Sequence, residues 1–460
     1  MLQGITNAAN IVVVLSLVYL IGVMISGRHQ PEVPIGSTDH LTPVFIVPCL
    51  NEERVIGQTL DRLLAIHRAL VVVIDDGSDD ATAEVVRKRQ NDRVLLAQRT
   101  LPHARHGKGA ALNYGFGRLV DWATGRGVDP ANTIVCVMDA DGVIDEQAVD
   151  RVLPYFLDRQ VAGCQILVRI RNRHKLIGRM QDVEFTTFTE LVQSGRQNIG
   201  SSGLGGNGQF TRLGALEELG THPWSDCLVE DLDLGLQLLA KGWDLRVCTD
   251  TFVAQQGLES VSRLVRQRTR WVQGLFQTWR RIPSILASPM KLRAQMDVLY
   301  ALVFPGIVAV VWPIVILVAH AYMLSLVLSS KVGAAFGSPR WWAAIAVWYS
   351  FTFGPALYLM FHYRRRTGEM TRVGAFLNAH VYALFQLIWY IAGWKAMARI
   401  ITRRHGWVKT ERYDEPDQPP LQIESNPSGY LAATPSTGNT GAADSAGRSA
   451  PDPGVSQPGT

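Results

Sequence analysis

The chain has 460 residues, of which 47% are apolar and 18% are charged, and its formal net charge is +5. This length predicts two or three structural regions, and the composition excludes an ordinary soluble enzyme in favour of a soluble domain joined to membrane segments. The positive charge gathers at 263–281 and 364–366, which suits a phosphate-facing or membrane-facing surface better than a nucleic-acid binder. The five cysteines lack CxxC spacing, so we expect reduced, mostly buried thiols without zinc.

The first apolar stretch predicts a transmembrane anchor at residues 1–28. Residues 5–26 are almost free of charge and long enough to cross a bilayer. Basic residues before the stretch and a small-residue cleavage site after it are missing, so we expect an uncleaved anchor. Because Arg28 follows the stretch and no Lys or Arg precedes it, the next domain is predicted to face the cytoplasm.

Residues 41–281 predict an α/β domain, because short apolar runs alternate with helical stretches as in βαβ units. We expect strands at 44–47, 71–74 and 134–138. Pro48 is predicted to end the first strand, and all three strands run into polar, turn-rich loops. The carboxyl ends of parallel strands share one edge of a sheet, where α/β domains bind ligands.

The strongest metal-site candidate follows the strand predicted at 134–138. Asp139 and Asp141 stand one residue apart at its end, before the turn-forming Gly142. Two carboxylates in this position suit Mg²⁺ or Mn²⁺ that also binds a substrate diphosphate. A solvated Asp-x-Asp-Gly turn is the structural alternative.

Asp75 and Asp76 end the strand at 71–74, and Gly77 and Ser78 follow them. Acids after strands of this type accept hydrogen bonds from a nucleotide base or ribose. A turn that leads into the next helix would also explain them.

Residues 105–113 form a basic, Gly-rich turn that enters a predicted helix. This is not a Walker A loop, because Pro102 occupies the place of the first Gly and Gly109 follows Lys108. Backbone amides at the helix start, together with Lys108, could still contact a phosphate.

The stretch 203–210 contains too many glycines for a helix or strand interior. Glycine at these positions allows the backbone to approach a ligand closely. A flexible connector remains the alternative explanation.

Residues 225–234 predict the start of a helix that ends at Lys241 and Gly242. The helix dipole favours acids in a first turn, but Glu230, Asp231 and Asp233 exceed what capping requires. A carboxylate held here could act as a general base.

Gln267, Arg270 and Trp271 share one face of another predicted helix. Arg suits bidentate binding of a diphosphate, and Trp offers a flat platform for a sugar ring. An interfacial basic helix with an aromatic anchor is the alternative.

An interfacial segment at 282–297 is predicted to lead into a C-terminal membrane region at 298–401. Its apolar tracts are 298–328, 341–363 and a more polar one at 373–401. Two spans would keep the basic run 364–366 in the cytoplasm, whereas a third would place later basic residues outside, so the number stays at two or three. Residues 414–460 are rich in Pro, Ser, Gly, Thr and Ala and predict a disordered tail.

The ordered set of motifs resembles the membrane-bound family 2 glycosyltransferases, which include synthases of hyaluronan, chitin oligosaccharide, cellulose and poly-N-acetylglucosamine. The motifs are Val-Pro-x-x-Asn-Glu-Glu at 47–53, Asp-Asp-Gly-Ser at 75–78, Gly-Lys-Gly-x-Ala-Leu-Asn at 107–113, Asp-x-Asp at 139–141, Glu-Asp at 230–231 and Gln-x-x-Arg-Trp at 267–271. The resemblance covers about 41–271 and the membrane layout. It implies a GT-A fold, a Rossmann-like nucleotide-sugar-binding domain, with a UDP-sugar as the usual donor and Mg²⁺ or Mn²⁺ as the metal.

The resemblance also implies roles for individual residues. Asp75 or Asp76 would contact the uridine. Asp139 and Asp141 would bind the metal on the diphosphate, with Asp141 as the preferred direct ligand. Asp231 would be the catalytic base.

Other residues are implied as further members of the site. The catalytic pair would include Glu230, and the substrate contacts would include Pro48, Asn51, Glu52, Lys108, Asn113, Asp139, Gly206, Gln267, Arg270 and Trp271. The chain departs from the family at Val229, where a Thr is usual, and at Leu204 and Asn207 in the acceptor loop. These departures leave the acceptor and the processivity open.

Together the motifs predict a metal-dependent, inverting glycosyltransferase with several spans in the cytoplasmic membrane and its catalytic domain in the cytoplasm. It would make a β-linked polysaccharide or, alternatively, add single sugars to diacylglycerol or a polyprenyl carrier. The expected partners are a nucleotide sugar, a glycan or lipid acceptor, membrane lipids and an accessory export subunit, and no nucleic acid.

Two other classes fit the sequence less well. A sugar nucleotidylyltransferase would need a Gly-rich, basic loop after the first strand, where this chain has residues 48–53. A transporter would hold its polar motifs at the bilayer midplane, whereas here they gather in the soluble domain.

Overall fold

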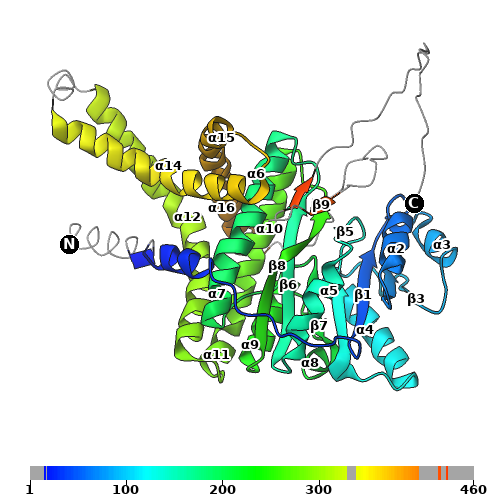
Figure 1. Ribbon diagram of the computed structural model, residues 1–460. Coiled ribbons are helices and arrows are strands. Elements are labelled where there is room, and N and C mark those ends of the chain that lie inside the picture. Colours follow the sequence, from blue (N-terminus) through cyan, green and yellow to red (C-terminus); the bar gives the residue numbers. More distant parts are fainter. Residues whose placement is uncertain (1–14, 17, 329–337, 404–422, 426–430, 434–460) are drawn as a thin grey trace, which may run out of the picture. The chain divides into compact units, whose positions relative to one another are not determined.

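The computed structural model describes residues 15–403 except 17 and 329–337, together with 423–425 and 431–433 (Figure 1). The chain divides into two units, 1–413 and 414–460. In the second unit, β9 (Ile423–Ser425) and β10 (Leu431–Ala433) pair as antiparallel strands, although the sequence predicts no regular structure there. The rest of the predicted tail lies outside the described residues, as does most of the predicted N-terminal anchor, of which residues 18–26 are helical.

The first unit is built on an eight-stranded mixed sheet in the order β3-β2-β1-β4-β7-β6-β8-β5. The strands are β1 (Thr42–Cys49), β2 (Leu70–Asp75), β3 (Val94–Gln98), β4 (Thr133–Val137), β5 (Val143–Ile144), β6 (Val161–Ile170), β7 (Gln209–Arg212) and β8 (Asp244–Gln255). The first four strands pair in parallel, as the three predicted runs require. β7 is antiparallel to both β4 and β6, while β8 is parallel to β6 and antiparallel to β5.

β1 continues through Pro48 to Cys49, so the prediction that Pro48 ends the strand is wrong. The backbone oxygen of Ile46 accepts a hydrogen bond from the Met138 amide, so Ile46 and Pro48, two residues apart, both face the β4 side. β1 pairs with β4 only as far as Ile46, because β4 ends at Val137. The missing N–H of Pro48 therefore breaks no hydrogen bond of the sheet.

Helices cover both faces of the sheet, because alternate residues of each strand point to opposite sides. Phe45 in β1 belongs to the same hydrophobic cluster as Leu60 of α2 (Ile56–Ala65), whereas Val44 belongs to the cluster of Phe116 in α4 (Lys108–Gly125). The other helices of this domain are α3 (Thr82–Arg87), α5 (Ala148–Val152), α6 (Leu176–Thr187), α7 (Ser194–Ile199), α8 (Leu213–Glu217), α9 (Glu230–Ala240), α10 (Val261–Thr278) and α11 (Ile282–Leu286). A π-helix at Phe188–Gln193 joins α6 to α7.

Long apolar helices follow: α12 (Leu292–Leu328), α14 (Pro339–Thr367), α15 (Arg372–Phe385) and α16 (Leu387–Ile401). Within the described residues, three segments are long and apolar enough to cross a membrane: Leu292–Val311, Trp341–Thr367 and Arg372–Ile401. α12 begins at Leu292 and so takes up part of the predicted interfacial segment. The third predicted tract consists of two helices that meet at Gln386, and α16 packs against α10 and α12.

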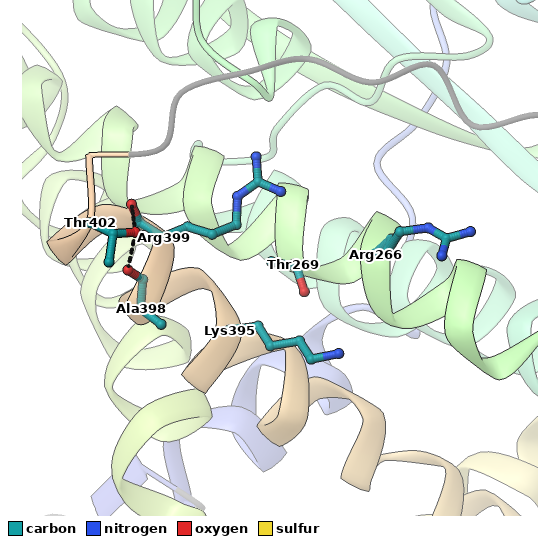
Figure 2. A pocket seen from close by; sticks show the side chains of 6 residues that line it. All are labelled: Arg266, Thr269, Lys395, Ala398, Arg399 and Thr402. Carbon is teal, nitrogen blue, oxygen red and sulfur yellow. Dashed lines mark hydrogen bonds between the residues drawn. The ribbon is translucent and has the colours of Figure 1, made fainter.

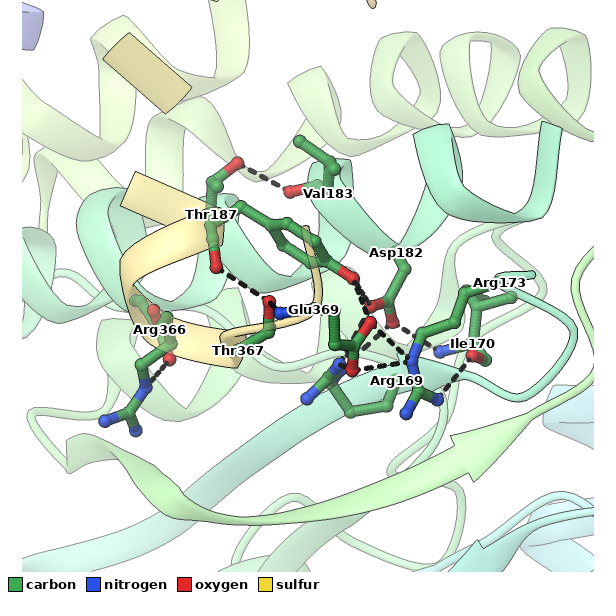
Figure 3. A network of polar contacts seen from close by, with 11 residues as sticks. Arg169, Ile170, Arg173, Asp182, Val183, Thr187, Arg366, Thr367 and Glu369 are labelled. Atoms are coloured by element: carbon green, nitrogen blue, oxygen red, sulfur yellow. Dashed lines mark hydrogen bonds and ion pairs between the residues drawn. The ribbon is translucent and has the colours of Figure 1, made fainter. Parts of the chain in front are cut away.

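A buried group of charges fixes α14 to the sheet domain (Figure 3). Asp182 of α6 is fully buried and lies 3.0 Å from Arg169 Nη2 of β6, and the Tyr363 hydroxyl of α14 donates to it over 2.6 Å. Arg169 and Arg173 also contact Glu369, at 3.4 and 3.0 Å. We call these five residues the clamp. Burial alone would raise the pKa of Asp182, but the charge and hydrogen bonds of Arg169 outweigh it and lower that pKa.

Candidate active site

A cavity of about 210 Å³ opens beyond the carboxyl ends of β1, β2 and β4. This is the edge at which parallel α/β sheets bind ligands. The predicted site residues that line it are Pro48, Glu52, Asp76, Lys108, Asp139, Asp141, Gln267 and Arg270. We call it the donor cavity.

Lys108, at the start of α4, joins several parts of the donor cavity. Its Nζ donates to Asp139 Oδ1 and to the Gly206 oxygen, both over 2.7 Å. A Cβ on Gly206 would lie 3.0 Å from Asp231 Oδ2 and 3.4 Å from Lys108 Nζ, so a side chain here would crowd both groups. Burial alone would lower the pKa of Lys108, but Asp139, Glu230 and Asp231 outweigh it and raise that pKa.

Glu230 and Asp231 form the first turn of α9, as predicted. Burial raises the pKa of both carboxyls, and the charge of Asp231 raises that of Glu230 further, against the lowering effect of Lys108. A carboxyl with a raised pKa can exchange a proton nearer to neutral pH than an exposed one can. Asp233 differs, because Arg281 lies 2.7 Å from it and, despite burial, its pKa is lowered.

Asp139 and Asp141 supply the oxygen atoms that a divalent ion would need. Both line the donor cavity, and Arg171 Nη1 donates to the backbone oxygen of Asp141. Among the described residues, no group of three or more His, Cys, Asp or Glu side chains could hold an ion by itself. Mg²⁺ sites often combine one or two carboxylates with substrate phosphates and water, so this donor set fits an ion that binds together with a diphosphate.

The two acids after β2 have different surroundings. Asp76 lines the donor cavity and pairs with Arg99 at 2.5 Å. Asp75 instead accepts hydrogen bonds from the Ser78 amide, at 3.0 Å, and from Gln98 Nε2, at 3.1 Å. The structure therefore favours Asp76 as the residue that faces a ligand.

The three predicted site residues of α10 have two different surroundings. Gln267 and Arg270 line the donor cavity, and Arg270 Nη1 donates to the Leu228 oxygen over 3.1 Å. Trp271 is not part of this lining, although the sequence suggests it as a sugar platform. Its ring centroid lies 3.9 Å from Cζ of the fully buried Arg268, and it also packs near Trp389 of α16.

Asn51 and Asn113 do not line the donor cavity but hold loops beside it. Asn51 has a left-handed φ of 54°, and its Oδ1 accepts from the Asp79 amide over 2.8 Å. Asn113 pairs with the backbone of Trp224 through bonds of 2.6 and 3.0 Å. Both side chains thus stabilise the loops that follow β1 and precede α9.

Sequence reasoning missed several residues that line the donor cavity. They are Cys49, Leu50, Gly107, Ala111, Gln181, Phe185, Gln255, Gln256 and Leu258. Gln255 and Gln256 come where β8 ends, so an apolar run followed by polar residues could have identified them. Arg99, the partner of Asp76, directly follows β3, so the same signal could have identified it.

Residues 43–274 match the family described as "Glycosyltransferase like family 2". A poly-beta-1,6-N-acetyl-D-glucosamine synthase of Staphylococcus aureus is 24% identical over 301 residues, which cover 63% of this chain and 66% of that protein. The probable glycosyltransferase YdaM of Bacillus subtilis is 28% identical over 239 residues, which cover 50% of this chain and 54% of that protein. The chain thus matches two thirds or less of the length of these relatives.

A solved structure shares the fold. The mannosyltransferase PcManGT from Pyrobaculum calidifontis, in complex with GDP-Man and Mn²⁺, superposes with a TM-score of 0.55 at 18% identity and covers 85% of this chain and 95% of that chain. The α/β sheet domain is therefore a GT-A domain, and the three apolar segments point to a membrane protein. Because the family match spans just over half of the chain, the protein belongs to glycosyltransferase family 2.

Proposed function

We propose that the protein transfers sugar from a UDP-sugar to an acceptor hydroxyl, inverts the anomeric carbon, and repeats this step to build a β-linked polysaccharide. One observation carries the proposal. Lys108 lines the donor cavity and contacts Asp139 beyond the end of β4, and Lys108 and Asp231 of α9 both lie close to Gly206. A candidate phosphate-binding cation thus lies near both a candidate metal ligand and a candidate base.

The donor would lie along the cavity with its nucleoside toward β2. Asp76 would accept hydrogen bonds from the base or ribose. Lys108 and Arg270 would bind the diphosphate through charge-assisted hydrogen bonds. Mg²⁺ or Mn²⁺ held by Asp139 and Asp141 would neutralise charge that develops on the departing diphosphate.

Asp231 would remove the proton from the acceptor hydroxyl as its oxygen bonds to the anomeric carbon and the bond to the diphosphate breaks. Its raised pKa suits a base that must accept a proton and later release it. Lys108 and Arg270 would stabilise the leaving diphosphate. One base and one leaving group imply a single displacement, so an α-linked donor gives a β-linked product.

The choice of a polymer rests on the similarity to the poly-beta-1,6-N-acetyl-D-glucosamine synthase of Staphylococcus aureus. The competing proposal is a glycolipid synthase, whose product is a lipid that carries one or two sugars. Its acceptor would reach the donor cavity from the membrane side, where Phe185 and Leu258 provide apolar wall. The two classes differ in the size and solubility of their product.

The test uses the full chain in lipid nanodiscs with Mn²⁺ or Mg²⁺ and a panel of radiolabelled UDP-sugars and GDP-mannose. A high-mass product from one UDP-sugar is the expected result. A small, solvent-extractable product would replace the polymer by a glycolipid. Turnover of GDP-mannose alone would overturn the proposed donor.

A further inference from the structure

A second cavity, of about 340 Å³, lies between α10 and α16 (Figure 2). Its lining consists of Arg266 and Thr269 from α10, Lys395, Ala398 and Arg399 from α16, and Thr402 directly after α16. Three of these six residues are cationic and none is acidic. We call this cavity the basic pocket.

The polar groups of the basic pocket are suited to an anion. Lys395 and Arg399 stand four residues apart on α16, and their side chains extend from it toward α10 in Figure 2. Within the described part of the chain Lys395 makes no ion pair, and Arg266 Nη1 has only a long bond of 3.4 Å to Ser262 Oγ. The side chain of Arg266 extends away from α16 in the same view (Figure 2). A phosphate that enters between the helices would gain favourable charge interactions with Lys395 and Arg399.

The two threonines do not compete for this role. Thr269 donates its hydroxyl to the Val265 oxygen over 2.7 Å, and Thr402 donates to the Ala398 oxygen over 2.8 Å. Donors to a ligand must therefore come from Arg266, Lys395 and Arg399. Ala398 leaves room between them.

The face of α16 that carries the cations continues as apolar surface. Leu387, Ile391, Lys395 and Arg399 repeat every four residues, so they share one side of the helix. Leu387 is 42% exposed and Ile391 is 48% exposed, inside the candidate membrane segment Arg372–Ile401. Exposed apolar residues followed by cations match the boundary between lipid tails and head groups.

We propose that the basic pocket binds the phosphate of an anionic phospholipid, whose acyl chains lie along Leu387 and Ile391. A soluble phosphate would use the cations but leave this apolar face uncovered. The pocket and the donor cavity share no lining residue, although α10 contributes to both, with Arg266 and Thr269 in the pocket and Gln267 and Arg270 in the cavity. Lipid binding would thus brace α10, and the proposal itself does not depend on the proposed reaction.

The test measures lipid binding by the full chain, delipidated in detergent and titrated with phosphatidylglycerol, by native mass spectrometry. Lys395→Gln/Arg399→Gln should weaken binding about tenfold or more, because each basic residue near an anionic head group contributes on the order of one factor of ten or somewhat less. Lys291→Gln/Arg293→Gln removes the same charges from exposed positions near the start of α12 and should bind like the unaltered chain. Melting temperatures confirm that each variant is folded.

Ala398→Leu gives a second test that keeps every charge, because it fills the pocket and should also weaken binding. Equal affinities of the pocket variants and the unaltered chain would overturn the proposal. Equal affinity for phosphatidylcholine would overturn the role of charge. Inorganic phosphate that binds as tightly as the lipid would show a soluble-phosphate site instead.

Discussion

Two groups of buried or partly buried acids in this protein have opposite electrostatic character. In the clamp, Asp182 is surrounded by donors and its pKa is lowered. At the start of α9, Glu230 and Asp231 lie beside each other and their pKa values are raised. The first arrangement stabilises the ionised form of Asp182. The second brings the pKa values of Glu230 and Asp231 closer to neutral pH, where they can gain or lose a proton. Burial alone therefore does not identify a candidate catalytic acid. The sign of the neighbouring charges matters, because cations lower the pKa of a buried carboxyl and anions raise it.

This contrast separates stability from chemistry, and mutations can test it. Changes in the clamp should alter unfolding, because they leave a buried charge unpaired. Changes at the start of α9 should mainly alter transfer and should change unfolding less than changes in the clamp do. Each variant below is therefore to be measured in both assays.

The largest expected effect is on transfer. Asp231→Asn removes the proposed base, so the rate should fall by roughly 10²- to 10⁴-fold. Binding of the UDP-sugar, measured by calorimetry, should change little. Asp226→Asn is the matched control, because Asp226 is an exposed carboxyl in the loop before α9. Full transfer by Asp231→Asn would show that another group is the base.

Next in size is the loss of the clamp. Asp182→Ala leaves Arg169 buried without its main partner, and such a loss typically costs about 3–5 kcal/mol of folding free energy. Unfolding should be followed by heat or denaturant in detergent. Glu369→Gln, at the more exposed side of the clamp, should destabilise less. An unchanged melting temperature for Asp182→Ala would show that the clamp does not stabilise the folded protein.

Removal of divalent ions should act only on the donor cavity. EDTA is expected to weaken UDP-sugar binding by about tenfold, or about 1.4 kcal/mol, and added Mn²⁺ should restore it. In Asp141→Asn, added Mn²⁺ should restore less of the UDP-sugar binding. The melting temperature should stay constant after EDTA, because it depends on the clamp. Donor binding that is indifferent to EDTA in the unaltered chain would contradict a metal site.

The smallest effect concerns pH. The pKa of Glu230 is raised on folding, so the folded chain holds this proton more tightly, and stability should fall as pH rises above the ordinary glutamate range toward the folded pKa. Glu230→Gln removes this dependence and should gain on the order of 1 kcal/mol relative to the unaltered chain at the alkaline end. Asp182 acts oppositely: its lowered pKa contributes stability above the unfolded pKa, which is lost on acidification. If the stability of Glu230→Gln and that of the unaltered chain change with pH in the same way, folding does not raise the pKa of Glu230.

The local sequence pattern, an apolar run followed by acids, correctly predicted strands whose ends border the donor cavity. Asp76, Asp139 and Asp141 follow apolar runs, and that signal lies within a few neighbouring residues. The parallel pairing of β1, β2 and β4 then brings the strand ends together. The same signal at the end of β8 was missed, because the order of strands across the sheet cannot be derived from any one of them.

Contacts between distant residues explain what the sequence could not reveal. Trp271 looked like a sugar platform, but its ring packs against Arg268 and near Trp389, from a helix far along the chain. Asn113 was implied as a substrate contact, and in the structure its side-chain amide pairs with the Trp224 backbone. Trp389 and Trp224 lie outside the motifs that contain Trp271 and Asn113, so these two contacts could not be read from the motifs.

The contacts of α16 also bear on how the protein is made. A Cβ on Gly393 of α16 would lie 2.5 Å from the Ala309 oxygen, so α16 and α12 meet backbone to backbone, while Trp389 donates to Glu184 of α6. A ribosome completes the whole GT-A domain before it reaches α16. Until that helix has been inserted, α10 lacks its neighbour and one wall of the donor cavity lacks support. We therefore expect the nascent enzyme to stay inactive until its membrane portion is complete, which would keep sugar nucleotides from being consumed away from the bilayer.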